Sequence, residues 1–211
     1  MNIFRSWAEN LKNFLPYIFV FIASLYQPWD ADLGWHLKYG EYFFKTGTIL
    51  KENTFSTQMP DFIWANTSWG VDLIYYTAFA LGGFLGLTIL GALVVTLTFY
   101  FFSRAFDLSF WQKAVIFPFL IILEDPVNAI SFRGQVFSVM LLGILMWILS
   151  AYERSGQRKK LFFLIPLFLF WANIHGQFIL GFGVLGLWFL LYFFREFISQ
   201  FPDFKIANFA S

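Results

Sequence analysis

Seven apolar segments separated by short polar stretches dominate the sequence and leave few folds open to it. They cover residues 13–28, 70–81, 86–103, 110–123, 135–151, 161–174 and 177–194. A helix needs about 20 mostly apolar residues to cross a bilayer, with a working range of about 17 to 25. Charged residues make up only 13% of the chain, too few to cover the surface of a soluble protein of this size. We therefore predict an all-α, polytopic membrane protein.

The short apolar segment 70–81 leaves two topologies open, because Gly82-Gly83 separates it from segment 86–103. In the first, the two glycines form a tight hairpin between two membrane spans. In the second, 70–81 lies flat in the outer interface and 86–103 is the second span. Lys and Arg favour the cytoplasmic side. The flat arrangement places ten of the fourteen Lys and Arg on the side of the N-terminus, whereas the hairpin places three there. We predict the flat arrangement.

The resulting topology has six spans, with the N-terminus in the cytoplasm and the protein in the plasma (inner) membrane. We treat 1–211 as one membrane domain. The first span is 13–28, a long outer loop with two interfacial helices covers 29–85, and five further spans lie within 86–194. The net charge of +1 offers no basic surface for nucleic acid. With no cysteine, the chain has no disulfide and no thiolate nucleophile.

A polar cluster follows the first span, where Asp30, Asp32 and His36 lie within seven residues. Residues 32–45 have the pattern of a helix, and at 100° per residue Lys38, Glu41 and Lys45 share one face. Asp32 and His36 fall on the opposite face, one turn apart and away from the solvated charges. A carboxylate that points away from water needs a partner. The alternative is that Asp32 only caps this helix.

Two later loops place polar residues on the same predicted side of the membrane. Arg133 and Gln135 lie between the third and fourth spans, and Asn173 and His175 lie between the fifth and sixth. Ionisable residues at the boundary of a polytopic protein often line a site. The structural alternatives are that Arg133 extends to lipid headgroups and that His175 makes one hydrogen bond between span ends. We predict that these loops converge with the cluster after the first span.

Such a site has two functional interpretations. In an enzyme acting on a lipid-linked substrate, a carboxylate would be a general base or would bind a hard divalent cation, and Arg133 would hold a phosphate. In a non-enzymatic lipid or solute carrier, the same groups would bind and release a solute. Carriers usually place polar groups near the middle of the membrane and contain internal repeats. Here the spans have apolar centres and no repeat is visible, which favours the enzyme.

Several motifs resemble a bacterial group of GT-C-type membrane glycosyltransferases, over nearly the whole chain. The first outer loop of that group has the pattern D-x-D-x-x-W-H followed by a helix and a T/D-x-F-S turn. The residues that carry the resemblance are Asp30-Ala31-Asp32-Leu33-Gly34-Trp35-His36, Gly40-Glu41, Gly47, Asn53-Thr54-Phe55-Ser56, Trp69 to Gly83, Ser131-Phe132-Arg133 with Gln135, and Trp171-Ala172-Asn173-Ile174-His175-Gly176.

The resemblance implies transfer of a sugar from a polyprenyl-phosphate donor at the outer membrane face, as in the related protein O-mannosyltransferases and aminoarabinose transferase. Asp30 or Asp32 would then be the base toward the acceptor, or would bind a divalent cation such as Mg²⁺ or Mn²⁺. Our choice for the base is Asp32. Arg133 would bind the donor phosphate. The other predicted substrate-binding residues are His36, His175, Asp72, Gln135 and Asn173.

The sequence departs from this group in two places. Relatives often carry an acid immediately before the Trp that opens the flat helix, where this chain has Ser68. Asp72, one turn later, would either replace that acid or favour the N-terminus of the helix. Members of the superfamily also have more spans and often a soluble C-terminal domain. We therefore expect this chain to be an N-terminal part of such an enzyme, with an inactive truncated relative as the alternative.

Overall fold

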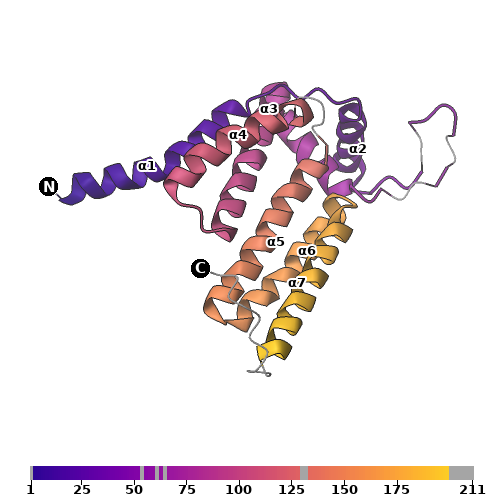
Figure 1. The fold of residues 1–211 in the computed structure, drawn as a ribbon. Coiled ribbons are helices and arrows are strands. Elements are labelled where there is room, and N and C mark those ends of the chain that lie inside the picture. Colours follow the sequence, from indigo (N-terminus) through magenta and orange to yellow (C-terminus); the bar gives the residue numbers. More distant parts are fainter. Residues whose placement is uncertain (1, 53–54, 60–61, 64–65, 129–132, 200–211) are drawn as a thin grey trace. The chain divides into compact units, whose positions relative to one another are not determined.

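The fold of the described residues is helical. The computed structural model describes residues 2–52, 55–59, 62–63, 66–128 and 133–199, and within them it contains α-helices, one 3-10 helix and one isolated bridge between Glu52 and Ile63 (Figure 1). Residues 1–176 form one compact unit, and residues 177–211 form a second. The prediction of an all-helical polytopic membrane protein is confirmed, since apolar helices of membrane-spanning length are present.

Helices α1 (Asn2–Ala23) and α4 (Phe110–Asn128) pack beside the second half of α3 (Figure 1). Their shared core is apolar and consists of the buried residues Val20, Val95, Phe99, Phe117 and Ile121. The rings of Phe99 and Phe117 meet edge to face at 4.8 Å. Burial of such aromatic side chains contributes a large part of the packing energy of a helical core.

Helix α3 (Trp69–Ala105) is two helices separated by a break at Gly82 and Gly83. Gly83 has φ 58° and ψ −144°, a conformation that essentially only glycine adopts. The halves fold back closely, because a Cβ on Gly86 would lie 2.2 Å from the carbonyl oxygen of Ala78. At 1.5 Å per residue, the first half, residues 69–81, is about 20 Å long, which is too short to cross a bilayer. The structure thus confirms the predicted separation of a short helix from the following span.

Helix α2 (Leu33–Thr46) packs against the first half of α3. It ends at Gly47, whose left-handed φ of 69° lets its N–H donate to the carbonyl of Phe43. The close approach depends on Gly40. A Cβ at that position would lie 2.4 Å from both the carbonyl oxygen of Asp72 and the Cβ of Tyr76. Contact between α2 and α3 in turn fixes the relative positions of His36 and Asp72.

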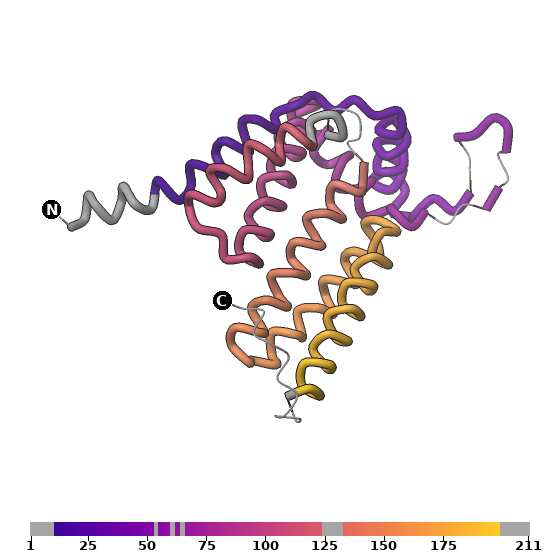
Figure 2. Tube along the Cα trace, viewed as in Figure 1, coloured from indigo at the N-terminus to yellow at the C-terminus, as the bar shows by residue number. Residues whose placement is uncertain are grey.

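Helix α5 (Gln135–Ser155) runs parallel to the second half of α3. Gly143 faces Phe102, and Ser150 donates to the carbonyl of Ala105 across 2.6 Å. A 3-10 helix, η1 (Arg158–Phe163), reverses the chain, and α6 (Leu164–Ile174) returns beside α5 (Figure 2). The fold of this unit therefore has two ends. We call the end with residues 24–36, 69–75, 133–138 and 171–176 the aspartate end, and the end with 103–113 and 150–163 the Arg154 end.

Three described helices are long and apolar enough to cross a membrane, namely Trp69–Ala105, Gln135–Ser155 and Phe178–Ile198. The last belongs to α7 (Phe178–Ser199), which forms the second unit. The apolar parts of α1 and α4, Leu11–Ala23 and Phe110–Leu123, are shorter, and α6 has 11 residues. Of the six predicted spans, the first (13–28), the third (110–123) and the fifth (161–174) therefore stay predictions.

Candidate functional site

An ion-pair cluster at the aspartate end joins Arg133, two positions before α5, to the loop after α1. Arg133 Nε donates to Asp30 Oδ2 across 2.8 Å, and its Nη2 lies 3.3 Å from Asp32 Oδ2. Asp30 also accepts a hydrogen bond of 2.7 Å from the backbone N–H of Asp32. The two loops that the sequence predicts on one side of the membrane therefore meet.

The two aspartates of this cluster differ in exposure. The Asp30 side chain is 2% exposed, whereas the side chains of Asp32 and Arg133 are 50% and 46% exposed. Hydrogen bonding to Asp30, together with the charges of Asp30 and then Asp32, raises the pKa of Arg133 above its usual value. Asp30 is therefore placed to hold the guanidinium, and Asp32 is placed to meet a molecule that arrives from outside.

A second cluster lies one helical turn away and pairs His36 with Asp72. His36 Nδ1 and Asp72 Oδ1 are 2.5 Å apart, and Asn66 Nδ2 donates to Asp72 Oδ2 across 2.6 Å. The Asp72 side chain is 3% exposed and that of His36 is 18% exposed. A carboxylate that accepts from Nδ1–H leaves Nε2 of the imidazole as the acceptor. Asp72 is thus buried behind His36, which is the more exposed member of the pair.

A buried tyrosine packs against this pair. The Tyr75 ring is buried and meets the His36 ring edge to face at 5.6 Å. On its other side it packs against Phe137 at the start of α5. Burial, and secondarily the negative charge of Asp72, raises the pKa of Tyr39 on α2. The Tyr75 ring limits the access of water to the pair, which strengthens the interaction of Asp72 with His36.

The residues after α6 reach the same end through Ser138. The imidazole Nδ1 of His175 lies 3.1 Å from Ser138 Oγ, which also accepts a hydrogen bond of 3.0 Å from the buried Trp171 Nε1. A Cβ on Gly134 would lie 3.0 Å from His175 Cδ2, so the loop that contains Arg133 contacts this histidine's ring. His175 therefore makes the hydrogen bond between helix ends that its structural alternative predicts.

Asn173 and Gln135, also predicted to bind substrate, take different positions. Asn173 Oδ1 accepts from Trp69 Nε1 across 2.8 Å, and its Nδ2 donates to the carbonyl of Leu169. Asn173 therefore fixes the start of α3 to the end of α6. Gln135 is the half-buried first residue of α5 and follows Arg133 by two positions. Ser131 and Phe132 of the same motif lie outside the described residues.

The predicted phasing of α2 is confirmed for Lys38, Glu41, Lys45 and His36. It is wrong for Asp32, whose side chain is 50% exposed because it precedes the helix and lies beside Arg133. Glu41 accepts hydrogen bonds from Lys38 and Lys45 on the exposed face, at 2.9 Å and 2.6 Å. Asp32 precedes the helix but its side chain makes no capping hydrogen bond. Its carboxylate faces Arg133 instead. The alternative that Asp32 only caps the helix is therefore wrong.

The predicted Mg²⁺ or Mn²⁺ site on Asp30 and Asp32 does not fit the residues as they stand. The Arg133 guanidinium lies between these carboxylates and already supplies the positive charge that they attract. Within the described part of the chain, no three His, Asp or Glu side chains come close enough to hold one metal ion. A cation at this position would have to displace Arg133, so the cation stays a sequence prediction.

Two residues of this region are not predicted from the sequence. Asn66 binds the second oxygen of Asp72, and Ser138 links Trp171 to His175. Asn66 lies in a loop without periodicity, so no pattern connects it with Asp72. Ser138 carries a weak signal, because it is a polar residue one turn into an apolar helix.

Comparisons of this chain with protein-family models, with curated proteins and with solved structures find no match.

Proposed function

We propose that the aspartate end is the active site of a membrane glycosyltransferase that moves a sugar from a polyprenyl-phosphate donor to an acceptor hydroxyl. The observation that carries the proposal is the pairing of two half-exposed groups of opposite charge, Asp32 and Arg133, 3.3 Å apart beside a fixed, buried Asp30. The resemblance of the motifs around these residues to GT-C-type transferases supplies the substrate class. We place this end at the outer face of the plasma membrane, with the N-terminus in the cytoplasm.

In the proposed reaction, the acceptor oxygen attacks the anomeric carbon of the donor sugar. A new carbon–oxygen bond forms with inversion, and the bond from the anomeric carbon to the phosphate oxygen breaks. The acceptor proton moves to the Asp32 carboxylate, which acts as general base. The leaving polyprenyl phosphate keeps the electron pair of the broken bond and gains one negative charge.

Arg133 matches the charge that develops on the leaving group. Nη2 of Arg133 is shared with Asp32 while that carboxylate is ionised. Protonation of Asp32 removes one of the two negative charges that hold the guanidinium. The same step creates a negative charge on the leaving phosphate, to which Arg133 Nη2 can then donate. Donors aimed at developing charge are usually the largest contribution to such a reaction. Asp30 keeps Nε of Arg133 in place throughout.

His36 and Asp72 lie on the same side of α2 as Asp32, and the backbone N–H of His36 donates to the carbonyl of Asp32. Asp72 orients the imidazole through Nδ1, so Nε2 faces away from the buried carboxylate. In this proposal, His36 accepts a hydrogen bond from the substrate and Asp72 and Asn66 position it. His175, Gln135 and Asn173 form or support the wall of the site toward α5 and α6.

Donor consumption by the reconstituted full chain tests the proposal. The purified protein is placed in vesicles with polyprenyl-phosphate donors carrying labelled hexoses or pentoses, solubilised cell envelope supplies acceptors, and release of polyprenyl phosphate is measured. Loss of a general base costs about 10²–10⁴ in rate, so Asp32→Asn should lose at least a hundredfold. Glu41→Gln, which changes an exposed carboxylate of the same helix, should keep the wild-type rate. Equal turnover by wild type and Asp32→Asn would show that Asp32 is not the base.

A further inference from the structure

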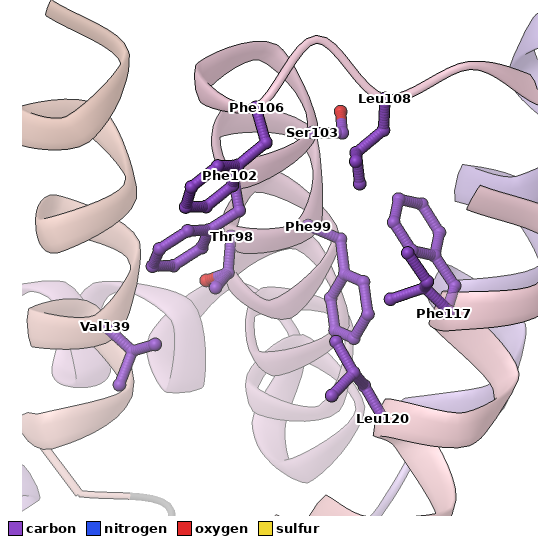
Figure 3. A pocket seen from close by; sticks show the side chains of 10 residues that line it. Thr98, Phe99, Phe102, Ser103, Phe106, Leu108, Phe117, Leu120 and Val139 are labelled. Carbon is purple, nitrogen blue, oxygen red and sulfur yellow. The ribbon is translucent and has the colours of Figure 1, made fainter. Parts of the chain in front are cut away.

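An apolar cavity lies among α3, α4 and α5, toward the Arg154 end and away from the aspartate cluster. Its volume is about 540 Å³, within the range of ligand sites, and Figure 3 shows its side chains converging from the three helices. Apart from Thr98 and Ser103 its wall is apolar, and it includes Phe99, Phe102, Phe106, Leu108, Phe117 and Val139.

The hydroxyl groups of the cavity wall are already used by the protein. Thr98 Oγ1 donates to the carbonyl of Val94, and Ser103 Oγ donates to the carbonyl of Tyr100 while pairing with the hydroxyl of Tyr17. The donors of these two hydroxyls are therefore occupied, and the rest of the wall is apolar. It fits a hydrocarbon chain, and residues 98–106 of α3 extend along it for about 12 Å at 1.5 Å per residue.

A buried ammonium group lies close to the wall of this cavity. Lys113, in the first turn of α4, is 8% exposed. Its Nζ lies 3.5 Å from the Tyr17 hydroxyl and 5.1 Å from the centre of the Tyr17 ring. The Tyr17 hydroxyl is 2.7 Å from Ser103 Oγ, which lines the cavity. The Lys113 ammonium group is therefore two hydrogen bonds away from Ser103 in the cavity wall. Ser103 and Leu108 lie at the end of the cavity nearest the loop after α3 (Figure 3).

The charge of Lys113 is not balanced by the described residues. None of the ion pairs in the described part of the chain includes it, and Asp107 of the adjacent loop is exposed. An ammonium group has three donors, and a single bond of 3.5 Å satisfies at most one of them weakly. A buried cation normally has an anionic partner, because its desolvation is costly otherwise. Lys12 adds a second cation nearby, 4.6 Å from the Phe110 ring centre.

We infer that this cavity binds an anionic phospholipid of the surrounding membrane, with an acyl chain between α3, α4 and α5 and the phosphate at Lys113. The phosphate supplies the missing counter-charge through charge-assisted hydrogen bonds. The apolar chain fills the cavity, and the headgroup lies at the end of the helices, where a bilayer places its phosphates. This lipid site is separate from the proposed sugar-transfer site and does not depend on it.

Native mass spectrometry of the full chain in a mild non-ionic detergent tests the headgroup. Phosphatidylglycerol and phosphatidylcholine with identical acyl chains are the two probes. One lysine near a lipid phosphate contributes roughly 1 kcal/mol, so the wild type should bind phosphatidylglycerol about fivefold more tightly. Lys113→Met should abolish the difference, Lys113→Arg should keep it, and Lys159→Met, at an exposed lysine of the same end, should also keep it. An unchanged preference in Lys113→Met would overturn the assignment of the phosphate to Lys113. Lys113→Gln replaces the Met variant if that variant does not fold.

A second pair of variants tests the acyl chain. Val139→Trp places a large ring at the cavity, whereas Val115→Trp places one on the exposed face of α4. Binding of both lipids should fall in the first variant and stay at the wild-type level in the second. Wild-type binding of both lipids by Val139→Trp would show that the cavity does not hold the chain.

Discussion

Arg133 and Asp30 are 103 positions apart in the sequence, yet Nε of Arg133 donates to Oδ2 of Asp30 across 2.8 Å. This contact joins the loop after α1 to the start of α5 and brings Asp32 to the same guanidinium. The carboxylate that is buried holds the arginine, and the carboxylate that is half exposed remains accessible. The two aspartates of one short motif therefore have separate roles.

This division predicts different effects on stability for the two aspartates. Asp30→Asn weakens a charged hydrogen bond at a buried site, which costs roughly 1–3 kcal/mol. Asp32→Asn changes a half-exposed pair, whose contribution is about 1 kcal/mol or less. Thermal unfolding in one detergent should therefore show the larger fall in melting temperature for Asp30→Asn. Equal falls in the two variants would contradict the distinction between them.

Two glycines of α2 form a matched pair for the contact with α3. Gly40→Ala places a methyl group 2.4 Å from the carbonyl oxygen of Asp72, and such overpacking costs about 1–3 kcal/mol. Gly34→Ala meets nothing within 4 Å and should stabilise the helix by up to about 1 kcal/mol. Unfolding midpoints of the two variants should move in opposite directions. The same sign for both would show that α2 does not pack at Gly40.

The exposed face of α2 gives a prediction for pH dependence. Hydrogen bonds from Lys45 and then Lys38 lower the pKa of Glu41 to about 2. Because the folded-state pKa lies below the ordinary value, the stabilising contribution is present above the ordinary carboxyl pKa and is lost as the pH falls toward 2. The difference in melting temperature between wild type and Glu41→Gln should therefore be larger at pH 7 than at pH 3. A difference that grows as the pH falls would contradict these ion pairs.

Patterns with a short period predict much of this fold. The two adjacent glycines at 82 and 83 mark the break in α3 because apolar segments flank them on both sides. Helical phasing separates Lys38, Glu41 and Lys45 from His36 without knowledge of any other segment. The asymmetry of Lys and Arg predicts that the loops with Asp32, Arg133 and His175 lie on one side of the membrane. In the structure these loops are in contact, through Arg133 with Asp32 and through Gly134 with His175.

Contacts that depend on tertiary packing are beyond such patterns. The pairing of His36 with Asp72 requires the close approach of two helices at Gly40, which periodicity does not specify. The motif resemblance implies that Arg133 binds a donor phosphate, whereas in the structure two of its nitrogens face aspartates. In the sequence, Lys113 is only one of the ten Lys and Arg that the predicted topology places on the side of the N-terminus. Its burial beside an apolar cavity follows from the packing of α1 against α4.

We propose that Asp32 and Arg133, which face each other in the structure, form one site at the outer membrane face. Because the chain has no cysteine, Asp32→Cys and Arg133→Cys can be introduced singly and together without any background thiol. In intact cells, a membrane-impermeant maleimide should label each single variant, and an impermeant bifunctional maleimide with a short spacer should cross-link the double variant. Labelling only after the membrane is permeabilised, or the absence of a cross-link when both cysteines are labelled, would contradict the account.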